Sequence, residues 1–332
     1  MTKRPSFTAR VHFSLLWHFL LMLVPAGFSV AAAPAPEVVI AMRYLQQSGV
    51  SHSHLYLYSI DGKLLRQLTN AGAGQDRNPI FSPSGDSIVF VRELPKHVTE
   101  WWSIGPRGDH LQRLDTAPPW YLEAKSSSHF TDVLYGPLNA AGEATLQRHF
   151  QAPDGGPEVR LAVVPGTEDS DTPDRWDVWL RPSQGSPEIR VGELPGYSAG
   201  FVAHDANDPD LMLQQGDWRV ILCFTHLNST EGDTVHALDL RLHKLVRLSP
   251  NWASCYPLPG EAGILTLSEQ RYTPFGDGTH TANCSYIDYW NANWRKVRYA
   301  APGAAGICYG ASLYRPGGKP PVIIVRIEPA DE

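Results

Sequence analysis

The sequence lacks the residue patterns of the common hydrolases and nucleotide-binding enzymes. It contains no G-x-S-x-G nucleophile motif, no H-E-x-x-H zinc motif and no glycine-rich phosphate loop between a strand and a helix. Charged residues make up only 19% of the 332 residues, and 28 basic side chains face 34 acidic ones. A nucleic-acid partner needs a concentrated basic surface, which this balance does not favour. We therefore expect no familiar hydrolase machinery, no bound cofactor and no nucleic-acid partner.

Long hydrophobic runs are also scarce, and the most extended one lies at the start of the chain. The apolar stretch over residues 13–30 follows a basic start and ends in small residues of the A-x-A type. This order predicts a signal peptide over residues 1–32, cleaved after Ala32. An uncleaved membrane anchor is the alternative, but Pro25 within the run favours cleavage. Cleavage would leave a single domain over residues 33–332 with no stable transmembrane anchor, in a periplasmic or secreted protein.

Cysteine is rare, and its few copies lie in the last third of the chain. In an oxidising compartment an even number of cysteines predicts disulfides, here two bonds with three possible pairings. A zinc site is the alternative, although the sequence has no C-x-x-C pair. The disulfide candidates are Cys223, Cys255, Cys284 and Cys308.

Glycine and proline are abundant, at 28 residues each, and they mark turns between short apolar runs. Residues 55–69, LYLYSIDGKLLRQLT, read as two strands joined by an Asp-Gly hairpin turn. Residues 79–94, PIFSPSGDSIVFVREL, read as two strands joined by a Ser-Pro-Ser-Gly turn. This composition indicates an all-β protein.

The strand-turn-strand unit recurs along the chain, which predicts a repeat architecture. Periods of roughly 40–50 residues are typical of β-propeller blades, and about 300 residues would hold six. A β-sandwich is the alternative. We expect strands at residues 37–44 and 320–329 to pair in one closing blade, because this removes two exposed edges. The further copies span residues 100–116, 148–164, 175–192, 234–250 and 284–302.

Two of these copies are too close together for each to begin a separate blade. The weaker copy at residues 148–164 has an Asp-Gly turn, and the copy at 175–192 begins soon after it. One of the two is therefore predicted to be out of register, or the region to carry an insertion.

Residues 55–91 resemble the repeat of the TolB-type β-propeller family, a WD40-like repeat. They carry the Asp-Gly turn, the Arg-Gln-Leu-Thr ending and the Ser-Pro-x-Gly turn, with Ser84 where the family usually has Asp. The resemblance implies an envelope propeller that makes contacts with proteins or polymers. The four-residue polar network of true WD40 blades is not recognisable, so apolar packing is expected to hold the blades together.

Four weaker groups of residues are candidate sites. An aromatic platform for a sugar or peptide is predicted from Trp101, Trp102, Trp120 and Tyr121, although such aromatics more often pack between blades. His52 and His54 lie on one side of a predicted strand and could bind copper or zinc. His204 and Asp205 are candidates for a binding or channel site. An acidic loop resembles a calcium site but lacks the Gly and Glu of the helix-loop-helix motif; it contains Asp169, Asp171 and Asp174.

Together these features favour an exported binding or scaffold protein without enzymatic activity. Its expected partner is a protein or a polymer of the cell envelope. The alternatives are a propeller enzyme, a polysaccharide lyase or hydrolase, and a metal-binding protein that uses channel His and Asp residues.

Overall fold

The computed structural model describes most of the chain after residue 34. The described ranges are 35–127, 149–152, 155–164, 175–195, 198–201, 212–228, 232–248, 253–257, 263–273, 282–301, 304–317 and 321–324. All of them belong to one compact unit, Ala35–Glu332. The predicted signal peptide, residues 1–32, lies outside the described residues. Of the helices in the described ranges, none has the length and hydrophobicity of a membrane span.

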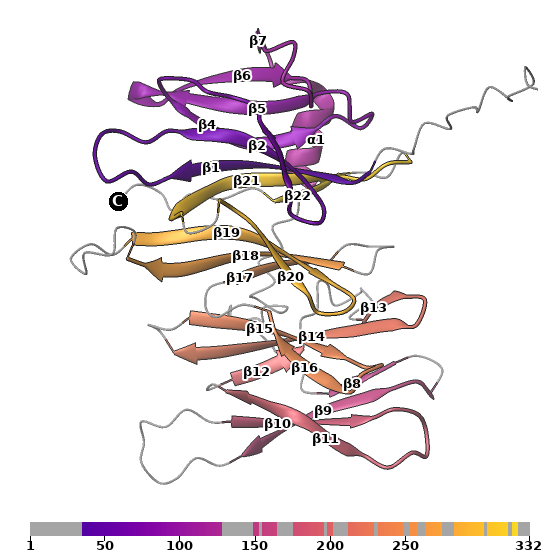
Figure 1. Cartoon of the computed structure of the whole chain (residues 1–332). Helices are drawn as coiled ribbons and strands as arrows, with labels where there is room; N and C mark the ends of the chain where they lie inside the picture. The colour runs from indigo at the N-terminus through magenta and orange to yellow at the C-terminus, as the bar shows by residue number, and fades with distance from the viewer. Residues whose placement is uncertain are drawn as a thin grey trace, which may run out of the picture. The chain divides into compact units, whose positions relative to one another are not determined.

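The protein is all-β, as predicted, and its described strands form five antiparallel sheets (Figure 1). Sheet I has the order β22 (Val322–Ile324), β21 (Gly306–Tyr314), β1 (Glu37–Tyr44), β2 (Ser53–Ser59), β3 (Leu64–Gln67). Sheet II contains β4 (Gln75–Phe81), β5 (Ile88–Leu94), β6 (Val98–Ile104) and β7 (Gln112–Leu114). A single 3-10 turn, Pro95–His97, joins β5 to β6, and α1 (Pro119–Ser127) follows β7.

Sheet III contains β8 (His149–Gln151), β9 (Glu158–Val164), β10 (Arg175–Arg181) and β11 (Ile189–Pro195). Sheet IV has β12 (Ser198–Phe201), β14 (Trp218–Asn228), β15 (Gly232–Asp239) and β16 (Lys244–Arg247), with β13 (Met212–Gln215) also paired to β14. Sheet V contains β17 (Ala253–Pro257), β18 (Gly263–Tyr272), β19 (Ala282–Asn291) and β20 (Lys296–Tyr299).

The predicted repeats map onto these sheets in a regular way. Five copies are the last hairpin of a sheet: β2–β3, β6–β7, β10–β11, β15–β16 and β19–β20. The weaker copy at residues 148–164 is β8–β9, the first hairpin of sheet III, so it corresponds to the opening hairpin β4–β5. The two close copies therefore lie in one sheet, and the weaker copy is out of register with the other five, which is one of the two predicted alternatives.

The strands at the two ends of the described unit share sheet I. They do not pair directly, because β21 lies between β1 and β22 and pairs with both (Figure 1). Five sheets are described, and the predicted count of six blades and the closure of a ring stay predictions.

Apolar side chains join the sheets in pairs. Clusters of buried residues lie between sheets I and II, I and V, IV and V, and III and IV. A fifth cluster packs between sheet II and α1. Phe81, for example, is fully buried between sheets I and II. Buried and more exposed side chains alternate along many strands because successive side chains point to opposite faces of a sheet.

A buried polar network also joins sheets I and II, which the sequence did not reveal. The Asp76 carboxylate accepts hydrogen bonds from Arg92 at 2.6 and 3.1 Å and from the Thr69 hydroxyl at 2.5 Å. The Thr69 oxygen accepts the Leu55 N–H at 2.9 Å, and the Ser53 hydroxyl donates to the Asp76 carbonyl at 2.7 Å. Asp76 is only 1% exposed. Apolar packing is therefore not the only force that holds these sheets together.

The predicted disulfides are not formed. Cys223, Cys284 and Cys308 are buried thiols outside any disulfide, on β14, β19 and β21, in three different sheets. They lie within the apolar clusters, where a thiol packs as a small hydrophobic group. Burial raises the pKa of the Cys223 thiol to about 12, so this group is unreactive near neutral pH. The side chain of Cys255 lies outside the described part of the chain.

The Ser-Pro-Ser-Gly turn joins β4 to β5 and is structural. The Ser82 hydroxyl donates to the Asp86 carboxylate at 2.8 Å, and the Gly85 N–H donates to the Ser82 carbonyl at 2.9 Å. Gly85 has a φ of +77°, which side chains rarely adopt. A Cβ at this position would lie 2.4 Å from the ring of Tyr314 on β21. The turn therefore packs closely against sheet I.

We expect Asp76→Asn to destabilise the protein strongly. The substitution leaves the Arg92 guanidinium buried without its counter-charge, and breaking such a pair costs about 3–5 kcal/mol. Denaturant unfolding of the variant and parent measures this loss. Asp177→Asn is the matched control, because its partner Arg190 is exposed and the loss should stay below about 1 kcal/mol. Equal losses in the two variants would contradict the assignment.

We also expect Gly85→Val to lower the melting temperature more than Gly108→Val. Both glycines have positive φ, at +77° and +82°, so both variants are strained by about 1–2 kcal/mol. Only at Gly85 does the new side chain meet a ring, because the space around Gly108 is open. The difference between the two melting temperatures thus reports the contact with Tyr314. It should vanish if the turn does not pack against β21.

Candidate functional site

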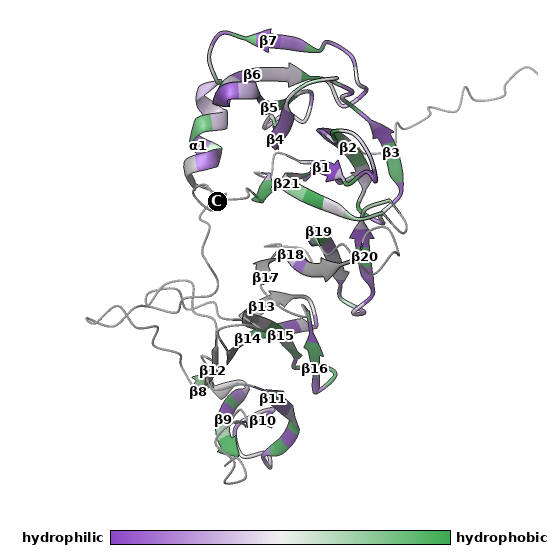
Figure 2. Ribbon diagram, turned by 90° about the vertical axis from the view of Figure 1, so that its left-hand side faces the viewer, coloured by the Kyte–Doolittle hydropathy of each residue, from purple (hydrophilic) through white to green (hydrophobic). Residues whose placement is uncertain are grey.

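One face of sheet III carries a dense group of charged side chains. Side chains on β9, β10 and β11 alternate between apolar and charged, as Figure 2 shows along these strands. Trp176, Val178 and Leu180 are buried against sheet IV. The residues between them point to the other face, which we call the charged face. It contains Arg160, Arg175, Arg181, Arg190, Glu158, Asp177, Glu188 and Glu193.

Ion pairs connect these side chains across the strands. Arg160 binds Glu188 through two hydrogen bonds, at 2.8 and 3.3 Å, and Arg190 lies 2.6 Å from Asp177 and 3.0 Å from Glu193. The hydrogen bond from Arg160 holds the pKa of the Glu188 carboxyl below its usual value. Four arginines thus face four carboxylates, and the face has no formal net charge.

Trp179 lies in the middle of the charged face. In the strand register it stands opposite Arg160 on one side and Arg190 on the other. The Arg160 guanidinium carbon lies 5.7 Å from the centre of the Trp179 ring, a cation–π distance. The Trp179 ring, with the Arg160 guanidinium beside it, places an aromatic group within a polar surface.

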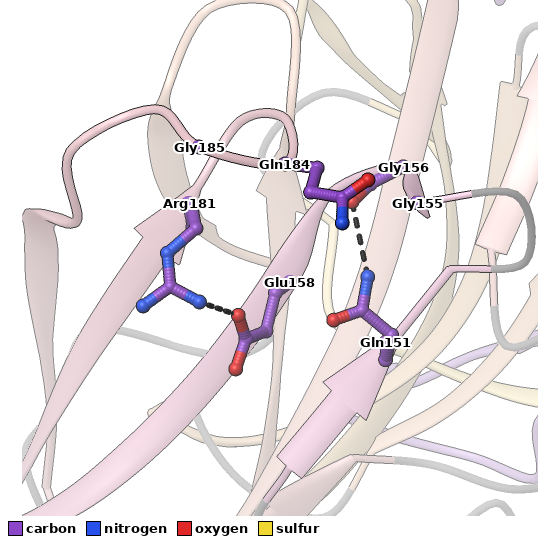
Figure 3. Close-up of a pocket in the computed structure, with 7 residues that line it drawn as sticks. All are labelled: Gln151, Gly155, Gly156, Glu158, Arg181, Gln184 and Gly185. Carbon is purple, nitrogen blue, oxygen red and sulfur yellow. Dashed lines mark hydrogen bonds and ion pairs between the residues drawn. The ribbon is translucent and has the colours of Figure 1, made fainter.

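A pocket of about 480 Å³ opens at the end of the charged face, where the β8–β9 and β10–β11 turns meet (Figure 3). It is lined by Gln151, Gly155, Gly156, Glu158, Arg181, Gln184 and Gly185. We call it the turn pocket. Its volume lies within the range of small-ligand sites, which is about 300–1,000 Å³.

Glycine-containing turns shape this pocket. Gly155 and Gly185 have φ values of +68° and +80°, so each permits a tight connection. The Gln184 N–H donates to the Gly155 carbonyl at 3.2 Å and links the two turns. The sequence predicted a turn at each position, and the structure brings the two together. Asp154 lies outside the described residues.

The side chains of the turn pocket supply both donors and acceptors. The Glu158 carboxylate is ion-paired with Arg181 (Figure 3). The same carboxylate lies 2.8 Å from the His149 imidazole. Gln151 donates to the Gly156 carbonyl at 3.1 Å, which leaves its own amide oxygen as an acceptor. The amide of Gln184 adds a further donor and acceptor. This set suits hydrogen bonding to a polar ligand that carries little charge.

The structure divides the predicted aromatic platform between two faces of β6. Trp101 packs with Trp120 and Tyr121, which belong to α1. Trp102 lies on the other face of β6, where the guanidinium carbon of Arg92 is 4.7 Å from the centre of the Trp102 ring. Tyr121 is fully buried and donates to the Asn78 carbonyl at 2.9 Å. The four rings therefore do not form one surface.

His54 lies on β2 and His52 directly precedes this strand, and the Nδ1 atom of each is buried without a hydrogen-bond partner. Burial lowers the pKa of His54, and the nearby Asp76 opposes this shift. Among the described residues no three His, Cys, Asp or Glu side chains cluster in a way that could hold a metal. His204 and Asp205 lie outside the described residues, as do Asp169, Asp171 and Asp174.

Comparisons with known proteins assign neither a family nor a function. No protein-family model matches, and no curated protein matches. Similar solved structures include TolB from Acinetobacter baumannii, with 10% identity over 81% of this chain and 54% of that one, at a TM-score of 0.23. The AtxE2 isopeptidase has 10% identity over 75% of this chain and 47% of its own, at a TM-score of 0.31. An oligogalacturonate lyase from Vibrio parahaemolyticus has 9% identity over 86% of this chain and 90% of its own, at a TM-score of 0.22. The chain spans about half the length of the first two.

His236, on β15, makes the stability of the protein sensitive to acid. Burial, together with the charge of Arg247, lowers the pKa of His236 from 6.5 to about 4. The unfolded chain takes up a proton near pH 6.5, whereas the folded chain does so only near pH 4. The contribution of this group is thus fully present above pH 6.5 and lost as the pH falls towards 4.

We expect His236→Gln to reduce the loss of stability at acid pH. Between pH 7 and pH 4, the free energy of unfolding of the variant should fall by on the order of 3 kcal/mol less than that of the parent. Denaturant unfolding at several pH values measures the change. His110→Gln is the control, because the side chain of His110 is 84% exposed and its curve should run parallel to that of the parent. Parallel curves for both variants would show that His236 is not protected from protons.

Proposed function

We propose that this chain is an exported β-propeller that acts as a binding or scaffold protein without enzymatic activity. Its docking surface is the charged face of sheet III together with the turn pocket. The partner is a protein or a polymer of the cell envelope with a polar and nearly uncharged contact region.

The ordered, charge-balanced face around Trp179 carries this proposal. Its arginines and carboxylates are already paired with one another, so a partner does not have to neutralise a surplus of charge. Packing such a face against an apolar surface would desolvate eight charged groups, and the desolvation penalty can exceed the gain from their pairing. Water or a polar partner is therefore the favourable neighbour of this face.

The turn pocket gives this face specificity. Backbone groups of two linked turns and two carboxamide side chains hold fixed positions for donors and acceptors. A ligand that fails to match them would leave buried polar groups unpaired, at about 1–3 kcal/mol for each group. Because Glu158 is paired with Arg181 and lies against His149, it supports binding as a fixed acceptor.

A retention experiment with a pocket variant tests this function. The immobilised full chain is exposed to a solubilised envelope fraction, and retained proteins and glycans are identified by mass spectrometry. We expect Gln151→Ala/Gln184→Ala to retain at least tenfold less of a specific component than the parent does. The control is Gln112→Ala/Asn293→Ala, which removes two exposed amides elsewhere and should retain as much as the parent.

The melting temperatures of both double variants are measured alongside, so that misfolding is separated from loss of binding. Equal retention by the pocket variant and the parent would contradict the proposed site. Cleavage of the envelope glycans by the parent chain, detected as new reducing ends or unsaturated products, would contradict a non-enzymatic role.

A further inference from the structure

A second pocket lies on the opposite side of the same two turns, between sheets III and IV. Its volume is about 300 Å³. Pro157, Leu180 and Pro182 line it from sheet III, and Asp217, Arg219, Leu240 and Arg241 line it from sheet IV. We call it the inter-sheet pocket. None of these residues lines the turn pocket, so this site is separate from the one in the proposed function.

The floor of the inter-sheet pocket is apolar. Leu180 is 0% exposed and Leu240 is 8% exposed, and both belong to the cluster that joins sheets III and IV. Pro157 is also buried, whereas Pro182 is half-buried and, beside Leu240, leaves apolar surface exposed to the pocket. A short hydrocarbon group placed on this floor would leave water for a preformed apolar surface, which is favourable.

One wall of the pocket is held rigidly by the buried carboxylate of Asp239. Its Oδ1 accepts the N–H groups of Arg241 and Leu242 at 2.9 and 3.0 Å, and its Oδ2 accepts the Trp294 indole N–H at 2.8 Å. Arg241 also donates to the Ala292 carbonyl at 3.1 Å. The guanidinium of Arg241 is therefore fixed by contacts made within the fold.

Arg219 differs from Arg241 because its guanidinium is exposed and has no ion-pair partner among the described residues. The nearest pocket carboxylate is that of Asp217, which is 84% exposed and lies 3.9 Å from Arg241 rather than on Arg219. A guanidinium presents parallel N–H groups that match the two oxygens of a carboxylate. The mouth of the pocket thus carries an open carboxylate-binding group above an apolar floor.

We propose that the inter-sheet pocket binds a carboxylate carried on a short apolar group. The carboxylate lies on Arg219, and the apolar group lies on Pro182 and Leu240. The C-terminal residue of a polypeptide and a free short-chain acid share this chemistry. The volume of the pocket limits the apolar part to one side chain or its equivalent.

Calorimetry with the full chain tests this site. The probes are 4-methylpentanoate, its neutral amide, the peptide acetyl-Gly-Gly-Leu with a free carboxylate, and the same peptide amidated. We expect at least one acid to bind the parent, and its amide to bind at least tenfold more weakly. Arg219→Gln should weaken binding of that acid at least tenfold. Arg295→Gln, an exposed arginine on another turn, is the matched control and should bind as the parent does.

The four probes distinguish the two sources of such a carboxylate. Binding of the peptide acid alone identifies a polypeptide C-terminus as the ligand, and binding of 4-methylpentanoate alone identifies a free acid. The proposal fails if the parent binds neither acid, if the amides bind as well as the acids, or if Arg219→Gln binds as the parent does. Because the turn-pocket variants leave Arg219 intact, failure here is distinct from failure of the proposed function.

Discussion

The alternation of side chains in sheet III is the constraint on which both candidate sites depend. A strand directs successive side chains to opposite faces, so a charged residue between two buried ones must point away from the apolar cluster. In β10, Trp176, Val178 and Leu180 fix the sheet on sheet IV. The register then forces the residues between them outward. A one-residue shift would exchange the two faces and bury the charges, so the apolar cluster also determines where the polar surface lies.

Similar ion pairs play different roles in the two parts of the structure. Asp76 and Arg92 are buried and joined to Thr69, so their pairing holds two sheets together at a high cost if one partner is lost. Arg190 and Asp177 pair at a similar distance on the charged face, where water screens them and each pair contributes little to stability. The same chemistry therefore holds two sheets together in one place. In the other it forms a hydrated surface whose ion pairs contribute little to stability and can be replaced by contacts with a partner.

Much of the fold could be predicted from the sequence, and the candidate site much less. The Asp-Gly and Ser-Pro-Ser-Gly turns indicated hairpins because these residues have few other uses between apolar runs. The buried network was missed because Ser53, Thr69, Asp76 and Arg92 are separated in sequence and meet only when two sheets pack. The aromatic platform failed because neighbouring residues such as Trp101 and Trp102 must face opposite ways on a strand. The charged face has a signal in the sequence that was not used, the alternation of charged and apolar residues in RWDVWLR, which is typical of a strand with one polar face.

The two turns of sheet III place two different binding environments within a few residues of each other. Gly156 lines the turn pocket and Pro157 the inter-sheet pocket, and Arg181 and Pro182 divide in the same way. A turn at the end of a sheet belongs to both faces, so residues next to each other in the chain can present hydrogen-bonding groups on one side and an apolar wall on the other. Because the strands below are held by the apolar cluster, neither environment has to form when a ligand arrives. Preorganisation of this kind lowers the entropic cost of binding, which is the physical reason to seek ligands at this end of sheet III.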